Sequence, residues 1–273
     1  MTPRMHLYIL ASGSKGNAAV VQGPTGSVLV DCGLSRRELH RRADMVGCDL
    51  DRVCAVLVTH EHSDHTSGLS VICNHFDGPV YATAGTVGAR KHLASLPFTL
   101  VDHDCTLSLG GMTVQAFPLS HDVADPMCFR FEVSDGNEMV DAIGWATDTG
   151  YLTEQALTAL KGCRILGIEA NHDLNMLATG PYPGYLKARV RGKSGHLSND
   201  QAAEALPSLI TQDTQTVVAM HISQKNNRPT LAARSLAHAV GAQFVEGSKT
   251  EARTKDGLLT VCVSSQDEPL VIW

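Results

Sequence analysis

The sequence predicts a mixed α/β fold in which helices cover the strands of two sheets. One observation is that the first half of the chain alternates short apolar runs with turn residues, as strands do. A second is that the latter half interleaves helical segments with short buried strands. The 273 residues are 43% hydrophobic, enough for a sizeable core, and no Pro/Gly/Ser-rich linker or short repeat interrupts them. We therefore expect residues 1–273 to form a single domain.

Strands are expected where turn residues bound a short apolar run. Val53–Val58 is the clearest case, because it is continuous, rich in Val and as long as a typical buried strand. The predicted strands are His6–Ala11, Ser27–Asp31, Val53–Val58, Pro79–Ala82, Met112–Leu119, Met127–Val133, Met139–Ala146, Arg164–Ile168, Thr216–Met220 and Leu270–Trp273. Several of them end just before a histidine or an aspartate.

Helices are expected where a capping residue or an early proline opens an apolar pattern of helical period. Ser35 and Ser198 are predicted N-caps, and Pro207 is expected to stop the helix that Ser198 opens. The predicted helices are Ser35–Met45, Leu152–Leu160, Ser198–Leu206 and Pro229–Val240, and the segment 183–191 can also form one.

Composition argues against several classes of protein. The sequence holds no run of about 18 apolar residues that could span a membrane, and its N-terminal apolar piece is too short for a secretory signal. We therefore expect a cytoplasmic protein without membrane association. The eight cysteines are scattered without a CxxC pair, which predicts buried, reduced thiols. The net charge of −6 argues against a protein that coats nucleic acid over its whole surface, but it allows a local basic strip beside a phosphate-handling cleft.

The segment Thr59–His65 gives the strongest chemical signal. It places the imidazoles of His60, His62 and His65 and the carboxylate of Asp64 within six residues, directly after the buried strand. In a loop that leaves a strand, His60 and His62 can point the same way, while Asp64 and His65 turn into the next helix. This arrangement gives two adjacent clusters of nitrogen and oxygen ligands, which suit zinc, manganese or iron.

This HxHxDH pattern resembles the first metal motif of the metallo-β-lactamase superfamily. Within it, the chain is most similar to the YycJ/WalJ-like hydrolases, which are related to exonuclease and phosphodiesterase members. The similarity lies in ASGSKGN (11–17), DCGLS (31–35), EANHD (169–173), SGHLSN (194–199) and HIS with NN (221–227), and it runs over nearly the whole chain. Cys32 departs from it, since a small residue is more usual there. The resemblance implies the metallo-β-lactamase fold, a four-layer αββα sandwich of two mixed sheets flanked by helices.

The resemblance also implies the remaining metal ligands, since His121, Asp148 and His221 each follow a predicted strand in the order that the family shows. The implied cofactors are two divalent metal ions, zinc or manganese, with iron as a further option. The implied ligands fall into two sets that share Asp148 as a bridge: His60, His62 and His121 on one ion, and Asp64, His65 and His221 on the other.

Two further residues are candidates for contact with a substrate. His196 resembles the non-ligand histidine with which phosphodiesterase members contact the scissile phosphate or protonate the leaving oxygen. Its alternative role is that of an ordinary surface histidine. Asn17 lies in a Gly-rich run without the residue order of a nucleotide-binding P-loop, so we expect a tight turn near the metal cleft, or one that is purely structural. His172 and its neighbours in 169–173 could orient metal ligands.

Basic residues lie shortly before His196 and shortly after His221 in the sequence. In an acidic protein they suggest a track for a phosphate backbone, and Lys187, Arg189 and Lys225 are the predicted substrate-binding residues. The alternative is structural: if 183–191 is a helix, basic residues at its end complement the helix dipole.

These features together predict a metal-dependent phosphodiesterase. Nuclease activity is favoured, and the resemblance implies a 5′-to-3′ exonuclease on DNA. A hydroxide bridging two metal ions would attack phosphorus, with Asp64 among the ligands and His196 assisting the leaving oxygen. The expected substrate is nucleic acid, with DNA favoured over RNA, or a small phosphodiester.

Three other functions are compatible with the same motifs. The centre could hydrolyse carboxyl esters, thioesters or lactones, because a metal-activated hydroxide attacks carbonyls equally well. Iron at the same ligands would give a redox enzyme, and a chain that kept only the scaffold would be a binding module. A β-lactamase is disfavoured, since Asp148 places a negative charge where those enzymes usually carry a thiol or a serine.

Overall fold

The computed structural model describes residues 5–136 and 138–273. Its contacts divide the chain into two compact units, and each is described by itself. The first unit comprises Met1–Pro118, Val123–Ala142 and Gln266–Trp273, and the second comprises Leu119–Asp122 and Ile143–Ser265. The single domain expected from the sequence stays a prediction.

The first unit contains a seven-stranded mixed sheet with the strand order β16-β1-β2-β3-β4-β5-β6. Strands β16, β1, β2 and β3 pair antiparallel, whereas β3, β4, β5 and β6 pair in parallel. Parallel strands are usually covered on both faces, and the last three residues of β4 are accordingly all buried. The strands are β1 His6–Ala11, β2 Ala18–Gln22, β3 Ser27–Val30, β4 Val53–Leu57, β5 Val80–Ala82, β6 Phe98–Leu100 and β16 Leu270–Ile272.

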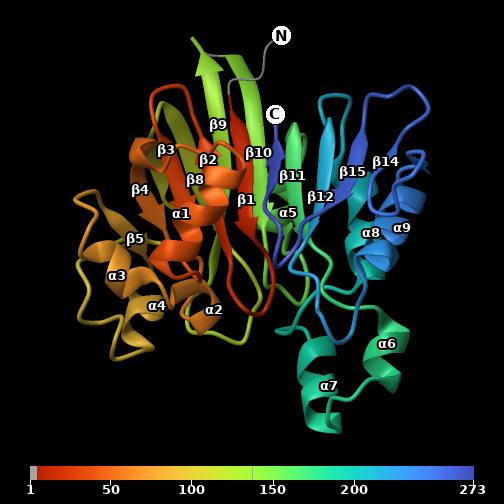
Figure 1. The fold of residues 1–273 in the computed structure, drawn as a ribbon, viewed down its shortest axis with the longest axis horizontal. Coiled ribbons are helices and arrows are strands. Elements are labelled where there is room, and N and C mark those ends of the chain that lie inside the picture. The colour runs from red at the N-terminus through yellow and green to blue at the C-terminus, as the bar shows by residue number, and fades with distance from the viewer. Residues whose placement is uncertain (1–4, 137) are drawn as a thin grey trace. The chain divides into compact units, whose positions relative to one another are not determined.

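Helix α1 (Arg36–Met45) packs against β1 of this sheet (Figure 1). The Ser35 side chain caps its first turn, as expected from the sequence. Leu39 and Ala43 lie four residues apart on one face of the helix, and both are buried. The other helices of this unit are single turns: the 3-10 helix η1 Leu50–Arg52, and α2 Ser63–Thr66, α3 Leu69–Cys73 and α4 Ala84–Gly88.

Three antiparallel strands complete the first unit: β7 (Thr106–Leu109), β8 (Met112–Pro118) and β9 (Met127–Asp135). Alternate residues of β8 are buried along most of its length, which is the pattern of a strand with one covered face. Strand β10 (Glu138–Ala146) begins in the first unit and ends in the second.

In the second unit, strands β10, β11, β12 and β15 pair in parallel, and β14 and β13 extend the sheet antiparallel. Because β10, β11 and β12 are parallel neighbours, their carboxyl ends lie at one edge of the sheet. The strands are β11 Ile165–Glu169, β12 Thr216–Met220, β13 Gln243–Phe244, β14 Ala252–Arg253 and β15 Thr260–Val263.

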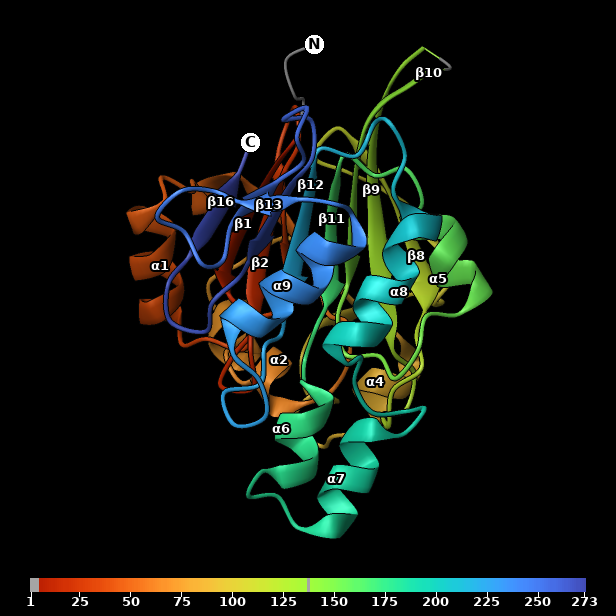
Figure 2. The same ribbon diagram turned by 90° about the vertical axis from the view of Figure 1, so that its right-hand side faces the viewer.

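Two longer helices cover this part of the sheet. Helices α8 (Asn199–Leu209) and α9 (Pro229–Ala239) lie side by side, and α9 packs on β12 and β15 (Figure 2). Ser198 and Gln201 form a capping box that begins α8, and its N-cap lies two residues after His196. The remaining helices are α5 Glu154–Leu160, α6 Leu174–Thr179 and α7 Gly184–Arg191.

The predicted strands and helices are confirmed, with most ends shifted by no more than two residues. Pro207 is the exception. It was expected to stop α8, but it lies inside the helix, which continues to Leu209. Leu206 and Leu209 are both fully buried, and this burial offsets the hydrogen bond that proline cannot donate. Within the described residues, every helix is too short or too polar to cross a bilayer.

Candidate metal centre

Asp31, Thr59 and His60 meet because two neighbouring strands of the first sheet end beside one another. Strands β3 and β4 are parallel, with Val30 opposite Leu57, so the residues that follow them share one edge. The backbone of Asp31 is left-handed, with φ of 59°, which costs a non-glycine residue about 1–2 kcal/mol. Such strained residues gather at functional sites, where the surrounding structure holds them.

The Asp31 carboxylate orients two of the predicted ligands. Its Oδ2 lies 2.7 Å from Nδ1 of His65 and accepts the Thr59 hydroxyl at 2.9 Å. Because that hydroxyl gives its proton to Asp31, its oxygen accepts from Nδ1 of His60, at 2.9 Å. Both imidazoles therefore carry their proton on Nδ1 and present Nε2 as an electron-pair donor. A metal-binding histidine is usually held in this way, by a hydrogen bond from its other nitrogen.

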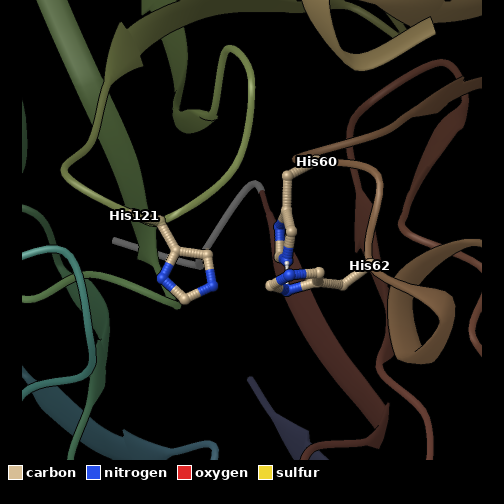
Figure 3. A group of neighbouring side chains, drawn as sticks. All are labelled: His60, His62 and His121. Atoms are coloured by element: carbon tan, nitrogen blue, oxygen red, sulfur yellow. Dashed lines mark hydrogen bonds between the residues drawn. The ribbon is translucent and has the colours of Figure 1, made fainter. Parts of the chain in front are cut away.

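His60 and His62 face each other nitrogen to nitrogen (Figure 3). Nε2 of His60 lies 3.1 Å from Nδ1 of His62, and the two rings are inclined by 80°. Two nitrogens that each bind a tetrahedral zinc ion at about 2.0–2.1 Å are roughly 3.3 Å apart. The spacing of this pair thus fits two ligands of one ion.

Asn17 reaches the same cluster from the turn between β1 and β2. Its amide nitrogen lies 2.9 Å from Nε2 of His65 and 3.3 Å from Oδ2 of Asp64. Gly33 makes this approach feasible, because a Cβ there would lie 1.6 Å from the Asp64 carbonyl oxygen. The expectation that Asn17 lies near the predicted ligands thus agrees with the geometry of the first unit.

In the second unit, Asp148, Glu169 and His221 meet at the carboxyl ends of β10, β11 and β12. Asp148 and His221 are both left-handed, with φ of 58° and 54°. With Asp31 they are the only non-glycine residues of positive φ in residues 5–136 and 138–273. All three lie just beyond a strand, where the left-handed turn directs a polar side chain into a cluster.

Asp148 faces three histidines with one carboxylate oxygen. Its Oδ1 lies 3.4 Å from Nδ1 of His221, 3.7 Å from Nδ1 of His196 and 4.0 Å from Nε2 of His121. The Thr147 hydroxyl donates to the other oxygen, Oδ2, at 2.7 Å. This buried carboxylate is therefore oriented, and its environment is rich in nitrogen donors.

The His121 ring is oriented by a hydrogen bond to a backbone carbonyl. It follows β8, and its Nδ1 lies 3.0 Å from the carbonyl oxygen of Gly195, which can only accept. His121 is the third side chain drawn in Figure 3. Burial lowers its pKa, so the ring is neutral near pH 7, with its proton on Nδ1 and its electron pair on Nε2. That is the form in which a histidine binds a metal ion.

Glu169 is a functional candidate whose contacts could not be read from the sequence. It is completely buried, and its Oε1 lies 2.7 Å from Nδ1 of His196 and 3.0 Å from Nδ1 of His221. Burial alone would raise the pKa of this carboxyl, but the facing imidazoles of His196 and His221 lower it to about 2. The available sequence signal was a glutamate ending a buried strand, inside the motif that also contains His172.

His196 lies between these groups. Its ring contacts the rings of His121 and His221, and its side chain is 21% exposed, whereas that of Glu169 is fully buried. Burial opposes protonation of His196, but the carboxylate of Glu169 outweighs it and raises its pKa. Since Nδ1 is bound to Glu169, Nε2 is the atom that remains to exchange a proton with a ligand.

The three basic residues predicted to bind substrate have different surroundings. Lys187 donates to the Ala178 carbonyl at 2.8 Å, and Arg189 pairs with Asp122, beside His121. Arg189 lies in the last turn of α7, so the helix-dipole interpretation also fits it. Lys225 is exposed in the turn after β12. These geometries leave the substrate-binding role of all three as a prediction.

The neighbours of Glu169 differ in what they do. The side-chain amide of Asn171 donates to the His221 carbonyl at 3.0 Å, so it holds the backbone from which that ring extends. Asp173 instead caps α6. His172 is completely buried, and neither ring nitrogen has a hydrogen-bond partner among the described residues. Burial lowers its pKa to about 4, which keeps the ring neutral.

The donor chemistry of each unit fits divalent metal ions. Each unit offers imidazole nitrogens in a fixed tautomer beside a carboxylate, the mixed N/O set that zinc and manganese accept. In the second unit, ligand atoms of Asp148, Glu169, His196 and His221 all lie within 4.8 Å of one another.

Comparison with known proteins relates the chain to a metal-dependent family. Residues 27–222 match the family described as a beta-lactamase superfamily domain. The exodeoxyribonuclease YycJ of Bacillus anthracis is 35% identical over 243 residues, which cover 86% of this chain and 89% of the relative. The exodeoxyribonuclease WalJ of Streptococcus pneumoniae is 32% identical over 230 residues, covering 82% and 84%.

A solved structure supports the same fold. The metallo-beta-lactamase fold protein YhfI from Bacillus subtilis superposes with a TM-score of 0.68 at 13% identity, and the match covers 98% of this chain and 99% of that one. The expected fold class is thereby confirmed, and the relatives confirm the resemblance to YycJ/WalJ-like hydrolases.

Proposed function

The chain belongs to the beta-lactamase superfamily and is a metal-dependent hydrolase, and from this premise we propose that it is a two-metal phosphodiesterase that degrades nucleic acid. The observation that carries the proposal is the pairing of His196 with buried Glu169 beside Asp148. A hydrolase needs its metal ligands, but a phosphodiesterase also benefits from a group that protonates a poorly leaving sugar oxygen. The His196–Glu169 pair has the chemistry for that second task.

The proposed ligands are those expected from the sequence. When bound, two divalent ions would supply Lewis acidity and lower the pKa of a water molecule toward 7. Zinc and manganese are the proposed metals. The proposed ligands are His60, His62 and His121 for one ion, Asp64, His65 and His221 for the other, and Asp148 for both.

The side chains of this chain divide the remaining work. Asp31 keeps the His65 electron pair on Nε2, and the Gly195 carbonyl does the same for His121. Glu169 accepts a hydrogen bond from Nδ1 of His196 and favours the imidazolium, whose Nε2–H can pass its proton to the departing oxygen. Asn17, Lys187, Arg189 and Lys225 are proposed to contact the phosphate backbone.

DNA is the proposed substrate, with hydrolysis from the 5′ end. Support comes from the relatives YycJ and WalJ, both described as exodeoxyribonucleases and both matched over more than four fifths of their length. RNA or a small phosphodiester would use the same ligands and the same proton donor, so the substrate must be distinguished by experiment.

The test is degradation of linear duplex DNA labelled at the 5′ or the 3′ end, with added manganese. The native protein is expected to release the 5′ label first, as mononucleotide, and Asp64→Ala is expected to be inactive. The same preparations are assayed on matched RNA, on bis(p-nitrophenyl) phosphate and on p-nitrophenyl acetate. Hydrolysis of the acetate by metal-loaded protein that cleaves none of the phosphodiesters would overturn the proposal in favour of an ester hydrolase.

A further inference from the structure

A second cluster of cations lies on the first unit, outside the proposed ligands. It is a depression of about 680 Å³, open to solvent, on the exposed side of α1 and α3. We call it the α1 basic patch, and its lining residues are Arg36, Arg37, His40, Arg41, Asp44, Val71 and His75. Three guanidinium groups and two imidazoles surround a single carboxylate, in a chain whose net charge is −6.

Two of these arginines have no evident role in the fold. Arg36 and Arg37 are exposed and form no ion pair or side-chain hydrogen bond with any other described residue. They also occupy the first turn of α1, where the helix dipole disfavours positive charge. These two arginines therefore add nothing to the stability of the fold, and binding of an anionic ligand explains their position better.

The other arginines of α1 provide the contrast. Arg42 is buried and donates to the carbonyls of Leu10 and Gln266 at 3.1 and 2.5 Å, which ties the helix to the sheet. Arg41 forms an ion pair with Glu38 at 2.9 Å, and Arg42 forms a second ion pair with the same carboxylate. Glu38 is therefore already paired with Arg41 and Arg42, and Arg36 and Arg37 keep their charge for another partner.

The shape of the patch favours a polymer over a small molecule. Small-ligand sites enclose most of their ligand and are mainly apolar, whereas this depression is open and lined mostly by cations and imidazoles. A phosphate backbone crossing the surface needs no enclosure, only spaced positive groups.

The patch is also connected to the proposed centre within the first unit. The loop 31–35 joins Asp31, which orients His65, to the start of α1. Its Gly33 nitrogen donates to the Asn17 carbonyl at 2.8 Å, and its Cys32 carbonyl accepts from the Gly68 nitrogen at 2.8 Å. One short, tightly bonded loop thus separates the ligand cluster from the first two arginines.

We propose that the α1 basic patch binds the phosphate backbone of the nucleic acid strand beyond the nucleotide being cleaved. This inference rests on the proposed function for the identity of the polymer. The contacts are to phosphate and carry no sequence preference. The patch would hold the substrate by charge and would take no part in bond cleavage.

The test compares native protein with the double variant Arg36→Ala/Arg37→Ala. The matched control is Arg90→Ala/Lys91→Ala, which removes two exposed cations from the same unit. Binding of a fluorescein-labelled 20-nucleotide single strand is followed by anisotropy in EDTA, over a range of NaCl concentrations, so that no hydrolysis intervenes. Hydrolysis of bis(p-nitrophenyl) phosphate with manganese is measured in parallel.

The patch variant is expected to bind the strand about tenfold more weakly, as two exposed charge contacts are lost. The slope of log affinity against log salt should fall by roughly 1.4, about 0.7 for each lost contact to a single strand. The control variant should bind like the native protein, and all three should hydrolyse the small ester equally.

Other outcomes separate the two proposals. Equal binding by the native protein and the patch variant would overturn the proposed role of the α1 basic patch and would not affect the proposed phosphodiesterase activity. Weakened binding without hydrolysis of any phosphodiester overturns the proposed function and leaves the patch as a nucleic-acid surface. If poly-glutamate displaces the strand as well as unlabelled DNA does, the partner is an acidic protein and the assignment to nucleic acid is wrong.

Discussion

Asn199 and Asn227 exchange two side-chain hydrogen bonds in the second unit. Asn199 Nδ2 donates to Asn227 Oδ1 at 3.0 Å, and Asn227 Nδ2 donates to Asn199 Oδ1 at 2.8 Å. Both residues are buried, and Asn227 also donates to the Ala170 carbonyl at 2.8 Å. This pair joins three segments, those that follow Glu169, His196 and His221, and so fixes the candidate residues relative to one another.

Asn227→Ala is expected to lower the free energy of unfolding by about 2–4 kcal/mol. The substitution leaves a buried amide and a buried carbonyl without partners, and each such group costs about 1–3 kcal/mol. Urea denaturation measures the change. Asn175→Ala, at an exposed position of α6, should stay within about 0.5 kcal/mol of native protein. Equal effects of the two substitutions would show that the paired amides do not stabilise the unit.

Asp31→Asn is expected to weaken metal binding by about 10- to 100-fold, the usual effect of losing a group that orients a ligand. The amide can donate to Nδ1 of His65, which would move the proton to Nε2 and remove the electron pair from the ligand position. Competition with a chromophoric chelator measures the affinity for zinc. An unchanged affinity, in a variant that melts like native protein, would contradict the role assigned to Asp31.

His172→Leu is expected to leave stability unchanged or to raise it by about 1 kcal/mol. Both ring nitrogens of His172 are buried without a partner among the described residues, so an apolar side chain removes a desolvation cost. Thermal unfolding checks this. A loss of more than 1 kcal/mol would mean that the ring makes a polar contact that the fold depends on.

The sequence predicts buried thiols, but Cys54 is exposed, so cysteine reactivity should separate it from the buried ones. Burial raises the pKa of Cys32 and of Cys48 to about 12, so at pH 8 only about one thiol in ten thousand is the reactive thiolate. Iodoacetamide labelling mapped by mass spectrometry should modify exposed Cys54 first and these two only after unfolding. Because their pKa is raised in the folded state, their contribution to stability holds below about pH 9 and is lost as the pH rises toward 12. Rapid labelling of Cys32 in folded protein would contradict its burial.

The contiguous part of the candidate site was predictable from the sequence, whereas its supporting carboxylates were not. His60, His62, Asp64 and His65 lie within six residues of one another, so their spacing alone predicts a metal cluster. Asp31 lies 34 residues before His65, and only the pairing of β3 with β4 brings them together. No local pattern encodes that contact.

The same distinction applies to the fold. Continuous apolar runs such as those of β4 and β12 can be recognised as strands from the sequence, because a buried strand must consist of apolar residues. Two-residue strands such as β13 and β14 exist only through hydrogen bonds to their neighbours, and α2 and α4 are too short to show a helical period. Pro207 shows tertiary burial outweighing a local helix-breaking signal.

The most direct test of the central claim is metal stoichiometry measured together with hydrolysis, by elemental analysis of native protein and of Asp148→Ala after equilibration with zinc or manganese. Asp148 is the proposed shared ligand, and its Oδ1 faces His221 at 3.4 Å. The native protein should hold about two ions per chain and cleave DNA, while the variant should lose at least one ion and all detectable cleavage. Two ions and full cleavage in Asp148→Ala, or cleavage by native protein stripped of metal, would contradict the two-metal account.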